Sequence, residues 1–237
     1  MADPVAVNSM FGRIAHRYDL ANRVLSWGID TYWRSRLVAT VRGWRPRNVL
    51  DLATGSGDVA FALARALRPE VGVFGLDFCE PMLERAETRK ARGPRRYSRV
   101  EFLFGDALDI PVEEASFDAV TIAFGLRNIA NRTRCFSEIR RILRPEGRMF
   151  ILEFSRPWRI VRPAYSFYRS QVVPRVAGVI TGNTAAYKYL SDTIAGFPDS
   201  ATLSAEIAEA GFGDVSVRKM TMGIVSLHSA RRQPRLS

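Results

Sequence analysis

The sequence predicts an α/β fold in which a mainly parallel sheet carries helices on both faces. Short apolar runs alternate with longer helical patterns over the middle of the chain. Three of the apolar runs end in an acid, at Asp51, Asp77 and Asp106. Because the carboxyl ends of parallel strands meet at one edge of a sheet, we expect these three carboxylates to lie close together.

The bulk composition narrows the class of protein. The chain has 237 residues and 47% of them are hydrophobic, which suits one α/β domain with a sizeable core. No apolar run reaches the roughly 18 residues that span a bilayer, and no signal peptide is evident. Cys79, Cys135, His16 and His228 lack metal-ligand spacing, so we expect no metal site and a reduced, cytoplasmic protein.

Two helices are expected before the first strand. Apolar residues at helical spacing predict one helix over residues 8–25 and another over residues 31–41, with Trp33, Leu37 and Val41 facing inward. Lying before the first strand, these helices either form a lid over the mouth of the sheet or cover its edge.

The loop after the first strand indicates the kind of ligand. Gly55 and Gly57 let backbone approach a ligand closely, because they carry no Cβ. Ala53 fits poorly in the tight first turn of a dinucleotide loop, and Asp58 would lie where a pyrophosphate carries its charge. Together with Asp51, Asp58 frames the loop with acids. A cationic ligand without phosphate, such as S-adenosylmethionine, therefore fits better than a dinucleotide.

The next two strands supply further groups for such a cofactor. Asp77 lies about 20 residues beyond the loop, where a carboxylate accepts hydrogen bonds from ribose hydroxyls. Asp106 is placed to bind an adenine amino group. Each acid alone could be a helix cap or a turn residue, but all three in series favour a cofactor site.

The remaining elements complete one predicted domain over residues 1–237. Its predicted parts are an N-terminal helical lid (8–42), a cofactor-binding core (48–154), an insertion (155–198), and a C-terminal helix with strands (199–230). The core elements are strand 48–52, helix 57–67, strand 71–77, helix 80–92, strand 100–104, strand 117–123, helix 132–143 and strand 147–153. The C-terminal elements are helix 201–210 with a cap at Gly211, strands 214–219 and 223–228, and a disordered basic tail over 231–237.

The insertion accounts for part of the net charge of +11. Residues 156–188 hold six Lys or Arg and no acid, together with several aromatic residues. Such a segment is typical of an interfacial membrane anchor, whereas the alternative is a core-packed insertion with a solvated basic face. In the membrane hypothesis, the side chains of Arg159, Arg162 and Arg169 contact anionic headgroups. The rings of Trp158, Tyr165 and Phe167 insert into the membrane.

Five motifs spread over the chain carry a family resemblance. They are YDLANRVLSWG at 18–28, FGLRN at 124–128, RILRPEG at 141–147 with LEFS at 152–155, YKYLSDTI at 187–194, and MTMGIVSLH at 220–228. These motifs resemble the ubiquinone/menaquinone biosynthesis C-methyltransferase family. Departures from the family pattern at Ala21, Asp30, Glu146 and Ser229 leave the exact substrate open.

The resemblance implies a class I methyltransferase fold, mostly parallel with an antiparallel C-terminal strand. It also implies methyl transfer from S-adenosylmethionine to a ring carbon of a prenylated quinol, for menaquinone, ubiquinone or both. Because such a quinol resides in the membrane, we expect the protein to contact the inner face of the cell membrane transiently. A homodimer is expected from the family alone. The cofactor residues, by resemblance and by the arguments above, are Asp51, Gly55, Ser56, Gly57, Asp77, Phe78, Asp106, Ala107 and Ala123.

Catalysis is assigned by resemblance to Arg127 and Asn128, which would activate the quinol. Arginine stays protonated, so Arg127 is better suited to stabilising a phenolate than to accepting a proton. Asn128 would donate a second hydrogen bond, and the base would be water or His228. The alternatives are a surface salt bridge for Arg127 and a merely packed ring for His228. Tyr18 and Asp19 would fold the lid helix over the cofactor.

Other functional classes fit less well. The loop sequence and the two preceding helices argue against an NAD-dependent oxidoreductase. An amino-group RNA methyltransferase would carry an Asn/Asp-Pro-Pro-aromatic motif where residues 123–126 read Ala-Phe-Gly-Leu, so we expect no nucleic-acid partner. A non-catalytic quinone carrier would have no use for three cofactor acids. A diverged methyltransferase acting on another phenolic ring stays open, as do the ring type and the prenyl tail length.

Overall fold

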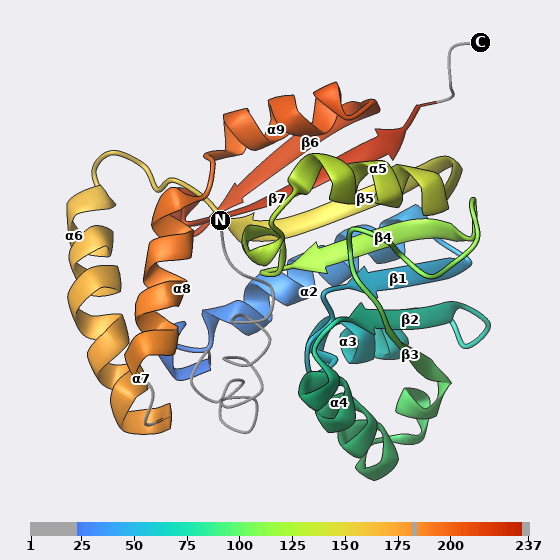
Figure 1. Ribbon diagram of the computed structural model, residues 1–237, viewed down its shortest axis with the longest axis horizontal. Helices are drawn as coiled ribbons and strands as arrows, with labels where there is room; N and C mark the ends of the chain where they lie inside the picture. Colours follow the sequence, from blue (N-terminus) through green and yellow to red (C-terminus); the bar gives the residue numbers. More distant parts are fainter. Residues whose placement is uncertain (1–22, 182–183, 234–237) are drawn as a thin grey trace.

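A seven-stranded sheet forms the centre of the computed structural model, which describes residues 23–181 and 184–233 (Figure 1). The strands are β1 (Asn48–Leu52), β2 (Gly72–Asp77), β3 (Val100–Phe104), β4 (Phe117–Ala123), β5 (Leu143–Phe154), β6 (Phe212–Met220) and β7 (Val225–Arg232). Their order in the sheet is β3-β2-β1-β4-β5-β7-β6. Neighbours from β3 to β5 are parallel, and β7 is antiparallel to both β5 and β6. The predicted fold class is confirmed.

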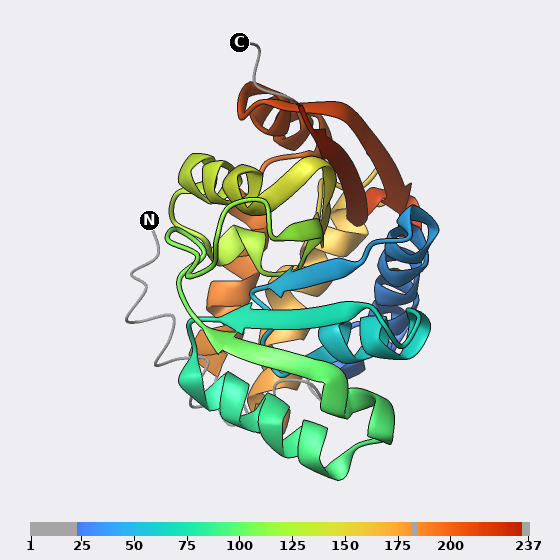
Figure 2. The ribbon, with the colours of Figure 1, turned by 90° about the vertical axis from the view of Figure 1, so that its right-hand side faces the viewer.

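Helices cover both faces of this sheet. Figure 2 shows α2 (Ile29–Trp44) and α3 (Asp58–Ala66) on one side and α5 (Arg132–Ile142) on the other. The α9 helix (Ser200–Glu209) packs with α5 on the second face. The α4 helix (Glu80–Arg92) and the short η1 (Arg95–Arg99) lie next to β3. The expected helix over 31–41 is therefore confirmed, and it extends further in both directions.

The strands alternate between two apolar cores, as a period of two residues requires. Val49 of β1 joins the core under α2 and α3, whereas Leu50 joins the core under α5 and α9. Trp33, Leu37 and Val41 of α2 are buried in the first core, which confirms the inward face predicted for that helix.

Side-chain caps fix the starts of two helices on the second face. The Asn131 side chain accepts a hydrogen bond from the Arg134 N–H (2.9 Å) at the start of α5. The Asp199 carboxylate likewise accepts from the Thr202 N–H (3.0 Å) at the start of α9. Such caps satisfy N–H groups that have no partner within the helix, typically stabilising it by about 1 kcal/mol.

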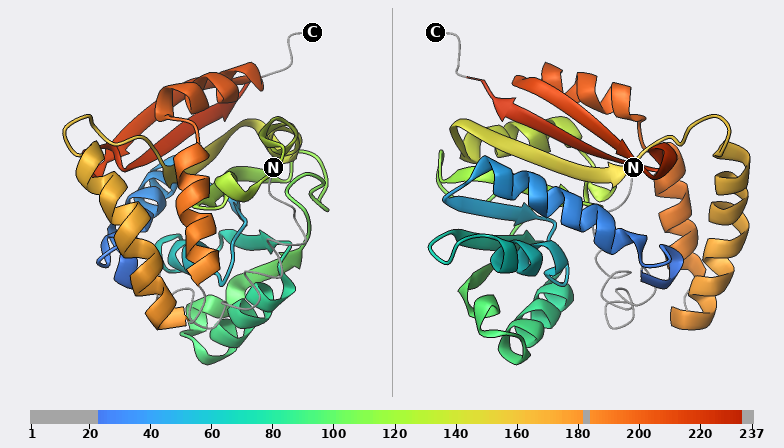
Figure 3. Two further views of the ribbon diagram at one scale, coloured as in Figure 1. Left: turned by 60° about the vertical axis from the view of Figure 1, so that its left-hand side comes forward. Right: turned by 180° about the vertical axis from the view of Figure 1, so that it is seen from behind.

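The insertion forms a group of helices beside the carboxyl ends of β4 and β5 (Figure 3). It consists of α6 (Arg162–Phe167), the π-helical η3 (Tyr168–Val172), α7 (Val173–Thr181) and α8 (Thr184–Gly196). Figure 3 also shows the first turn of α2 reaching toward this group, and the Tyr168 hydroxyl donates to the Leu25 carbonyl (2.7 Å). Among the described residues, no helix combines the length and the apolar character needed to cross a bilayer.

Some predicted features lie outside the described residues. Of the helix expected over residues 8–25, only residues 23–25 are described, and they are helical. His16, Tyr18 and Asp19 fall in the part that is not described, as does the side chain of Tyr187.

The predicted start of β5 and the predicted end of the last strand differ most from the structure, by four residues each. β5 begins at Leu143 rather than at residue 147, because Leu143 already pairs with Phe117 before an irregular turn in which Glu146 has a φ of +66°. The prediction of a disordered tail from residue 231 is wrong for its first two residues, which belong to β7. Arg231 lies there because acids compensate its charge, with its Nε 2.7 Å from an Asp214 oxygen.

Candidate active site

The loop after β1 is held in a tight conformation. Ala53, the first residue after the strand, has a φ of +55°, and the next N–H, that of Thr54, donates to the Leu76 carbonyl (3.0 Å). Gly57 precedes α3 with a φ of +85°, and a Cβ there would lie 2.7 Å from the Phe61 ring. The loop therefore needs glycine at position 57 for both its backbone conformation and its space, while alanine is accommodated at position 53.

A cavity of about 440 Å³ opens beside this loop, at the carboxyl ends of the parallel strands. Its walls come from the loop, from the ends of β2, β3 and β4, from the first turns of α2 and from the insertion. Asp51, Asp77 and Asp106 all line it, as expected for residues that end parallel strands.

Asp51 is a buried acid at the base of the cavity. Its carboxylate accepts hydrogen bonds from the hydroxyls of Thr54 (2.7 Å) and Thr121 (2.6 Å). Burial raises the Asp51 pKa to about 6, although both hydroxyls act to lower it. An acid in this state responds strongly to any positive charge placed in the cavity.

Asp77 ties the loop to the end of β2. One of its oxygens accepts from the Gly55 N–H (2.7 Å) and the other from the Cys79 N–H (3.0 Å). Burial raises the Asp77 pKa, although these two hydrogen bonds and a third from the Phe78 N–H act to lower it. Asp106 differs from the other acids, because it is exposed and accepts from the Leu108 N–H (2.9 Å) in a turn.

The structure brings together most of the predicted cofactor residues. Eight of them line the cavity: Asp51, Gly55, Ser56, Asp77, Phe78, Asp106, Ala107 and Ala123. Gly57 does not line it, because it lies behind the loop against Phe61 and Phe102. Its contribution is therefore to the shape of the loop and to the start of α3.

Arg127 lies on the opposite side of the cavity, in the turn η2 (Leu126–Asn128) after β4. Its side chain is 2% exposed and its Nη1 lies 2.8 Å from an oxygen of the fully buried Glu153. The same nitrogen donates to the Phe124 carbonyl. The Arg127 Nε is buried and has no hydrogen-bond partner among the described residues. The ion pair is therefore a buried one, not the surface salt bridge considered above.

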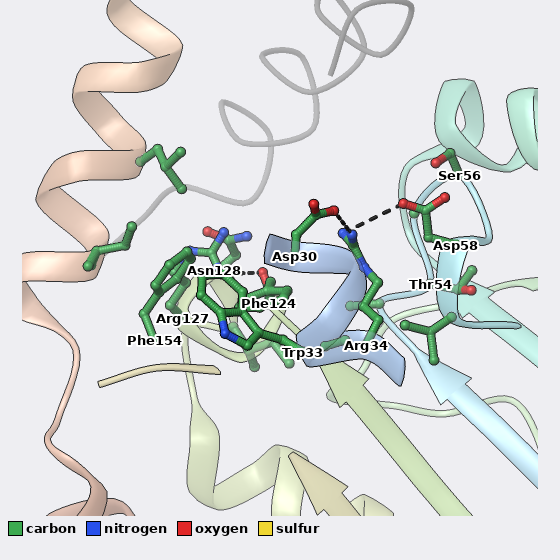
Figure 4. Close-up of a pocket in the computed structure, with 18 of the residues that line it drawn as sticks. Asp30, Trp33, Arg34, Thr54, Ser56, Asp58, Phe124, Arg127, Asn128 and Phe154 are labelled. Atoms are coloured by element: carbon green, nitrogen blue, oxygen red, sulfur yellow. Dashed lines mark hydrogen bonds and ion pairs between the residues drawn. The ribbon is translucent and has the colours of Figure 1, made fainter. Parts of the chain in front are cut away.

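A cluster of aromatic rings lies beside this arginine. The Phe154 ring centroid lies 5.3 Å from the Arg127 guanidinium and 5.0 Å from the Phe124 centroid. Trp33 of α2 completes the group, with its indole N–H donating to the Thr221 hydroxyl (2.8 Å). Figure 4 shows Trp33, Phe124, Arg127 and Phe154 clustered away from the loop residues. The cavity thus has an acidic end at the loop and an aromatic end around Arg127.

Asn128 lies next to this group and also lines the cavity. Its side-chain oxygen is 3.4 Å from the hydroxyl of Tyr189 on α8. This contact places an insertion helix directly against the predicted catalytic pair.

His228 lies outside the cavity. It is 1% exposed in the middle of β7, opposite Ile151, and its Nε2 is 3.1 Å from the Ser200 carbonyl oxygen. Burial lowers the His228 pKa and keeps the ring neutral. This corrects the expectation that His228 is a candidate base beside water, because β7 runs antiparallel and Ile224, just before its start, lines the cavity, whereas the middle of the strand does not.

Two insertion side chains point inward rather than outward. Tyr165 and Arg169 line the cavity, and Arg169 hydrogen-bonds to Ser191 of α8 (3.1 Å to the hydroxyl). Burial raises the Tyr165 pKa to about 12, so its hydroxyl stays protonated. The expectation that these two side chains face a membrane is therefore wrong, whereas Trp158 and Phe167 are exposed.

The sequence analysis missed a network of charges between α2 and the loop. Arg34 of α2 hydrogen-bonds to Asp30 one turn earlier, and its Nη2 lies 3.6 Å from Asp58 at the start of α3 (Figure 4). Attraction by Arg34 and Arg89 lowers the Asp58 pKa although burial alone would raise it. The spacing of four residues between Asp30 and Arg34 was a visible signal for their pairing, but the partnership with Asp58 depends on the fold.

Sequence comparison relates this chain to known proteins over most of its length. A family model described as the ubiE/COQ5 methyltransferase family matches residues 2–232. The "Ubiquinone/menaquinone biosynthesis C-methyltransferase UbiE" of Geobacter sulfurreducens is 40% identical over 227 residues, covering 95% of this chain and 88% of that protein. The "Demethylmenaquinone methyltransferase" of Thermus thermophilus is 43% identical over 224 residues, covering 94% of this chain and 100% of that protein.

Solved structures agree on the fold. A crystal structure from Thermotoga maritima, described as an S-adenosylmethionine-dependent methyltransferase and possible histamine N-methyltransferase, has a TM-score of 0.69 and 18% sequence identity. The match covers 96% of this chain and 100% of that chain.

Proposed function

Because this chain belongs to the ubiE/COQ5 methyltransferase family, we propose that it methylates a ring carbon of a prenylated naphthoquinol, the demethylated precursor of menaquinone. It is an S-adenosylmethionine-dependent C-methyltransferase, and its relatives support a role in quinone biosynthesis. A prenylated benzoquinol is the second acceptor to be tested, since one set of relatives is named for both quinones.

The cavity suits the cofactor at its loop end. When bound, S-adenosylmethionine supplies an electrophilic methyl group on a positively charged sulfur. Asp77 has carboxylate lone pairs left for ribose hydroxyls, since its two oxygens offer about four acceptor sites and accept from the N–H groups of Gly55, Phe78 and Cys79. Asp51 offers negative charge to the cationic part, and Ala107 and Phe78 line the wall next to Asp106, where adenine is expected.

The observation that carries the proposal is the position of Arg127. A permanently charged guanidinium lies in an aromatic wall of the same cavity as the cofactor loop, where water is largely replaced by protein. A phenolate forming on an acceptor ring would accept hydrogen bonds from Arg127 donors other than the Nη1 that contacts Glu153, and from the Asn128 amide. With His228 outside the cavity, we assign the phenolic proton to water.

Glu153 holds Arg127 in place for this task. Glu153 accepts from the Arg127 side chain (2.8 Å), from the Arg127 N–H (3.3 Å) and from the Phe154 N–H (2.8 Å). The arginine is therefore oriented before any acceptor arrives, which is the kind of preorganisation that lowers a barrier.

The apolar part of the cavity is proposed to bind the prenyl tail. Its lining there comes from the first turn of α2 and the residues before it, from the insertion, and from the residue before β7: Leu25, Ile29, Val173, Leu190, Ile194 and Ile224. A hydrocarbon chain buried against such side chains gains roughly 0.8 kcal/mol per CH₂ group. A polyprenyl tail of this kind also explains why the insertion forms one wall of the cavity.

A membrane surface is the proposed partner, because a prenylated quinol resides in the bilayer. Trp158, Ile160 and Phe167 are exposed near the start of the insertion, and Arg159 and Arg162 are exposed beside them. Exposed aromatic and aliphatic groups among cations suit an anionic membrane interface. The enzyme would dock transiently at the inner face of the cell membrane.

Methyl transfer from labelled S-adenosylmethionine tests the proposal directly. Demethylmenaquinone and its prenylated benzoquinone counterpart are each chemically reduced to the quinol and offered in parallel. We expect label in the naphthoquinol product. Label in the benzoquinol alone would reassign the ring. No label in either, with cofactor binding intact, would reject the quinol proposal in favour of another phenolic acceptor.

A further inference from the structure

The α2–loop ion-pair network joins α2 and the residues just before it to the cofactor loop and the start of α3. Its members are Arg23, Arg34, Arg89, Asp30 and Asp58. Arg34 is the central member, because its two terminal nitrogens approach acids on different elements, Asp30 on α2 and Asp58 on α3. Figure 4 shows its side chain extended between these acids, at the edge of the cavity.

The network carries one more positive charge than negative charge. It has three arginines and two aspartates, and both aspartates already accept contacts from more than one arginine. Arg89 is bonded to Ser56 and to Asp58, and Arg23 is largely exposed. Arg34 lines the cavity with 17% of its side chain exposed. Asp30 and Asp58 also line the cavity, but Arg34 is the arginine of the network that does so, and the surplus positive charge therefore reaches the cavity through Arg34.

Arg34 also has capacity for another partner. Its Nη1 is hydrogen-bonded to Asp30, but its Nη2 lies 3.6 Å from Asp58, which is longer than a good hydrogen bond. A guanidinium has five N–H donors in a fixed fork that matches a carboxylate. A carboxylate ligand would complete the hydrogen bonding of this side chain.

The cofactor proposed for the cavity brings such a group. The methionine part of S-adenosylmethionine is a zwitterion with one ammonium and one carboxylate. Asp51 lines the same part of the cavity, and Arg34 is near enough for its charge to act on Asp51. An acid and an arginine side by side form a matched pair for a zwitterion.

Other cavity-lining arginines are engaged elsewhere. Arg127 is held by Glu153 at the aromatic end, and Arg169 is bonded to Ser191 on α8. Arg34, by contrast, contacts the first residue of the helix that follows the cofactor loop. We propose that Arg34 binds the carboxylate of the methionine part of S-adenosylmethionine, with Asp30 and Asp58 holding its guanidinium in position. This inference rests on the proposed use of the cavity for that cofactor.

Such binding would link the cofactor to the acceptor wall. Trp33, adjacent to Arg34 on α2, packs against Phe124 and Phe154 beside Arg127. The Arg34 guanidinium itself lies 5.7 Å from the Phe124 ring centroid. A ligand held by Arg34 would therefore steady the helix that also forms part of the aromatic end.

Calorimetric titration with two ligands tests the inference without relying on turnover. The ligands are S-adenosylmethionine and decarboxylated S-adenosylmethionine, which lacks only the carboxylate. We expect the unmodified protein to bind the first about 10- to 100-fold more tightly, the range of one charge-assisted contact. Arg34→Gln should weaken S-adenosylmethionine binding by the same factor and leave the decarboxylated ligand unchanged. Arg34→Lys should discriminate partially, because it keeps the charge without the fork.

Arg42→Gln is the matched control, since Arg42 is exposed on the same helix and does not line the cavity. It should preserve the preference for the carboxylate. Equal affinity of the unmodified protein for both ligands would overturn the inference. So would Arg34→Gln and Arg34→Lys variants that lose affinity for both ligands by the same factor. Failure of the unmodified protein to bind either ligand would overturn the proposed cofactor site itself, which distinguishes the two conclusions.

Discussion

At the residue scale, the site depends on charges that are buried and must be balanced. Arg127 and Glu153 form an ion pair that is almost fully removed from water. Removing one partner of such a pair leaves the other charge buried without compensation, whereas replacing both is often nearly neutral. Stability and catalysis can therefore be separated at this pair.

Arg127→Met is expected to destabilise the fold by about 3–5 kcal/mol, because Glu153 loses its partner. Adding Glu153→Gln should recover most of that loss. Turnover in the double variant should stay about 100- to 1,000-fold below normal, the typical effect of losing one donor to a developing oxyanion. Urea unfolding and methyl-transfer assays measure the two quantities. Recovery of turnover together with stability would show that Arg127 is merely structural.

Asp51 makes stability depend on pH in the sense opposite to most carboxylates. Burial raises its pKa from 3.8 to about 6, so the folded state binds the proton more tightly than the unfolded chain. The stability that this group contributes below pH 3.8 is lost as the pH rises through about 6. The shift corresponds to about 3 kcal/mol.

Asp51→Asn removes this titration. The variant should therefore gain up to about 3 kcal/mol of unfolding free energy relative to the unmodified protein between pH 4 and pH 7. Urea denaturation of both proteins at the two pH values gives the change in unfolding free energy with pH for each protein. Subtracting one change from the other cancels the contributions of the other titrating groups. A difference that is the same at both pH values would mean that Asp51 ionises normally.

At the element scale, the sequence predicted the sheet well. The strands β1, β3 and β4 begin and end where expected, since each is a short apolar run that stops at polar or small residues. The start of β5 was harder to predict, because Pro145-Glu146-Gly147 is typical of a turn. The pairing of Leu143 with Phe117 in the structure shows that the strand begins before this turn. The ion pair between Arg231 of β7 and Asp214 of β6 is likewise formed across strands. The basic composition of the C-terminal residues gives no sign of it.

The site was predictable only where it follows from strand ends. The acids at or just beyond the carboxyl ends of β1, β2 and β3 meet at the cavity because parallel strands share an edge. His228 was misplaced because its orientation depends on the direction and register of β7. Arg34 was missed because its partner Asp58 is 24 residues away in sequence and is brought close by the packing of α2 on α3.

The contact between the β1 loop and the turn after β4 is close enough to test with a compensating pair. A Cβ on Gly125 would lie 2.6 Å from the Ala53 Cβ, and Ala53 itself has a φ of +55°. Gly125→Ala should therefore destabilise the protein by about 1–3 kcal/mol and weaken cofactor binding. Ala53→Gly in the same chain should restore both, because glycine removes the obstructing Cβ and suits the backbone.

Thermal unfolding with and without S-adenosylhomocysteine measures this effect. Ala53→Gly alone is the control and should change stability little, since relief of the left-handed conformation offsets the greater freedom of the unfolded chain. Additive losses in the double variant would mean that the two positions are not in contact as described.

At the scale of the whole molecule, the chain combines a cofactor-binding sheet with a wall of helices that has apolar side chains on both surfaces. Inward-facing insertion residues such as Tyr165 and Leu190 line the cavity. Outward-facing ones such as Ile160 and Phe167 are 86% and 64% exposed. Figure 1 shows the insertion helices at one end of the molecule, beyond the carboxyl ends of the strands. This arrangement places a proposed membrane contact next to the proposed quinol site.

Vesicle flotation tests that contact. The protein is expected to float with vesicles containing an anionic phospholipid and to be released as salt is added, because headgroup attraction is screened. Ile160→Glu with Phe167→Glu should abolish flotation, since buried apolar groups are replaced by charges that anionic headgroups repel. Val217→Glu is the matched control, an exposed apolar residue on β6 that should tolerate the change. Flotation that survives the double substitution would place the contact on another surface, and binding insensitive to salt would remove the arginines from it.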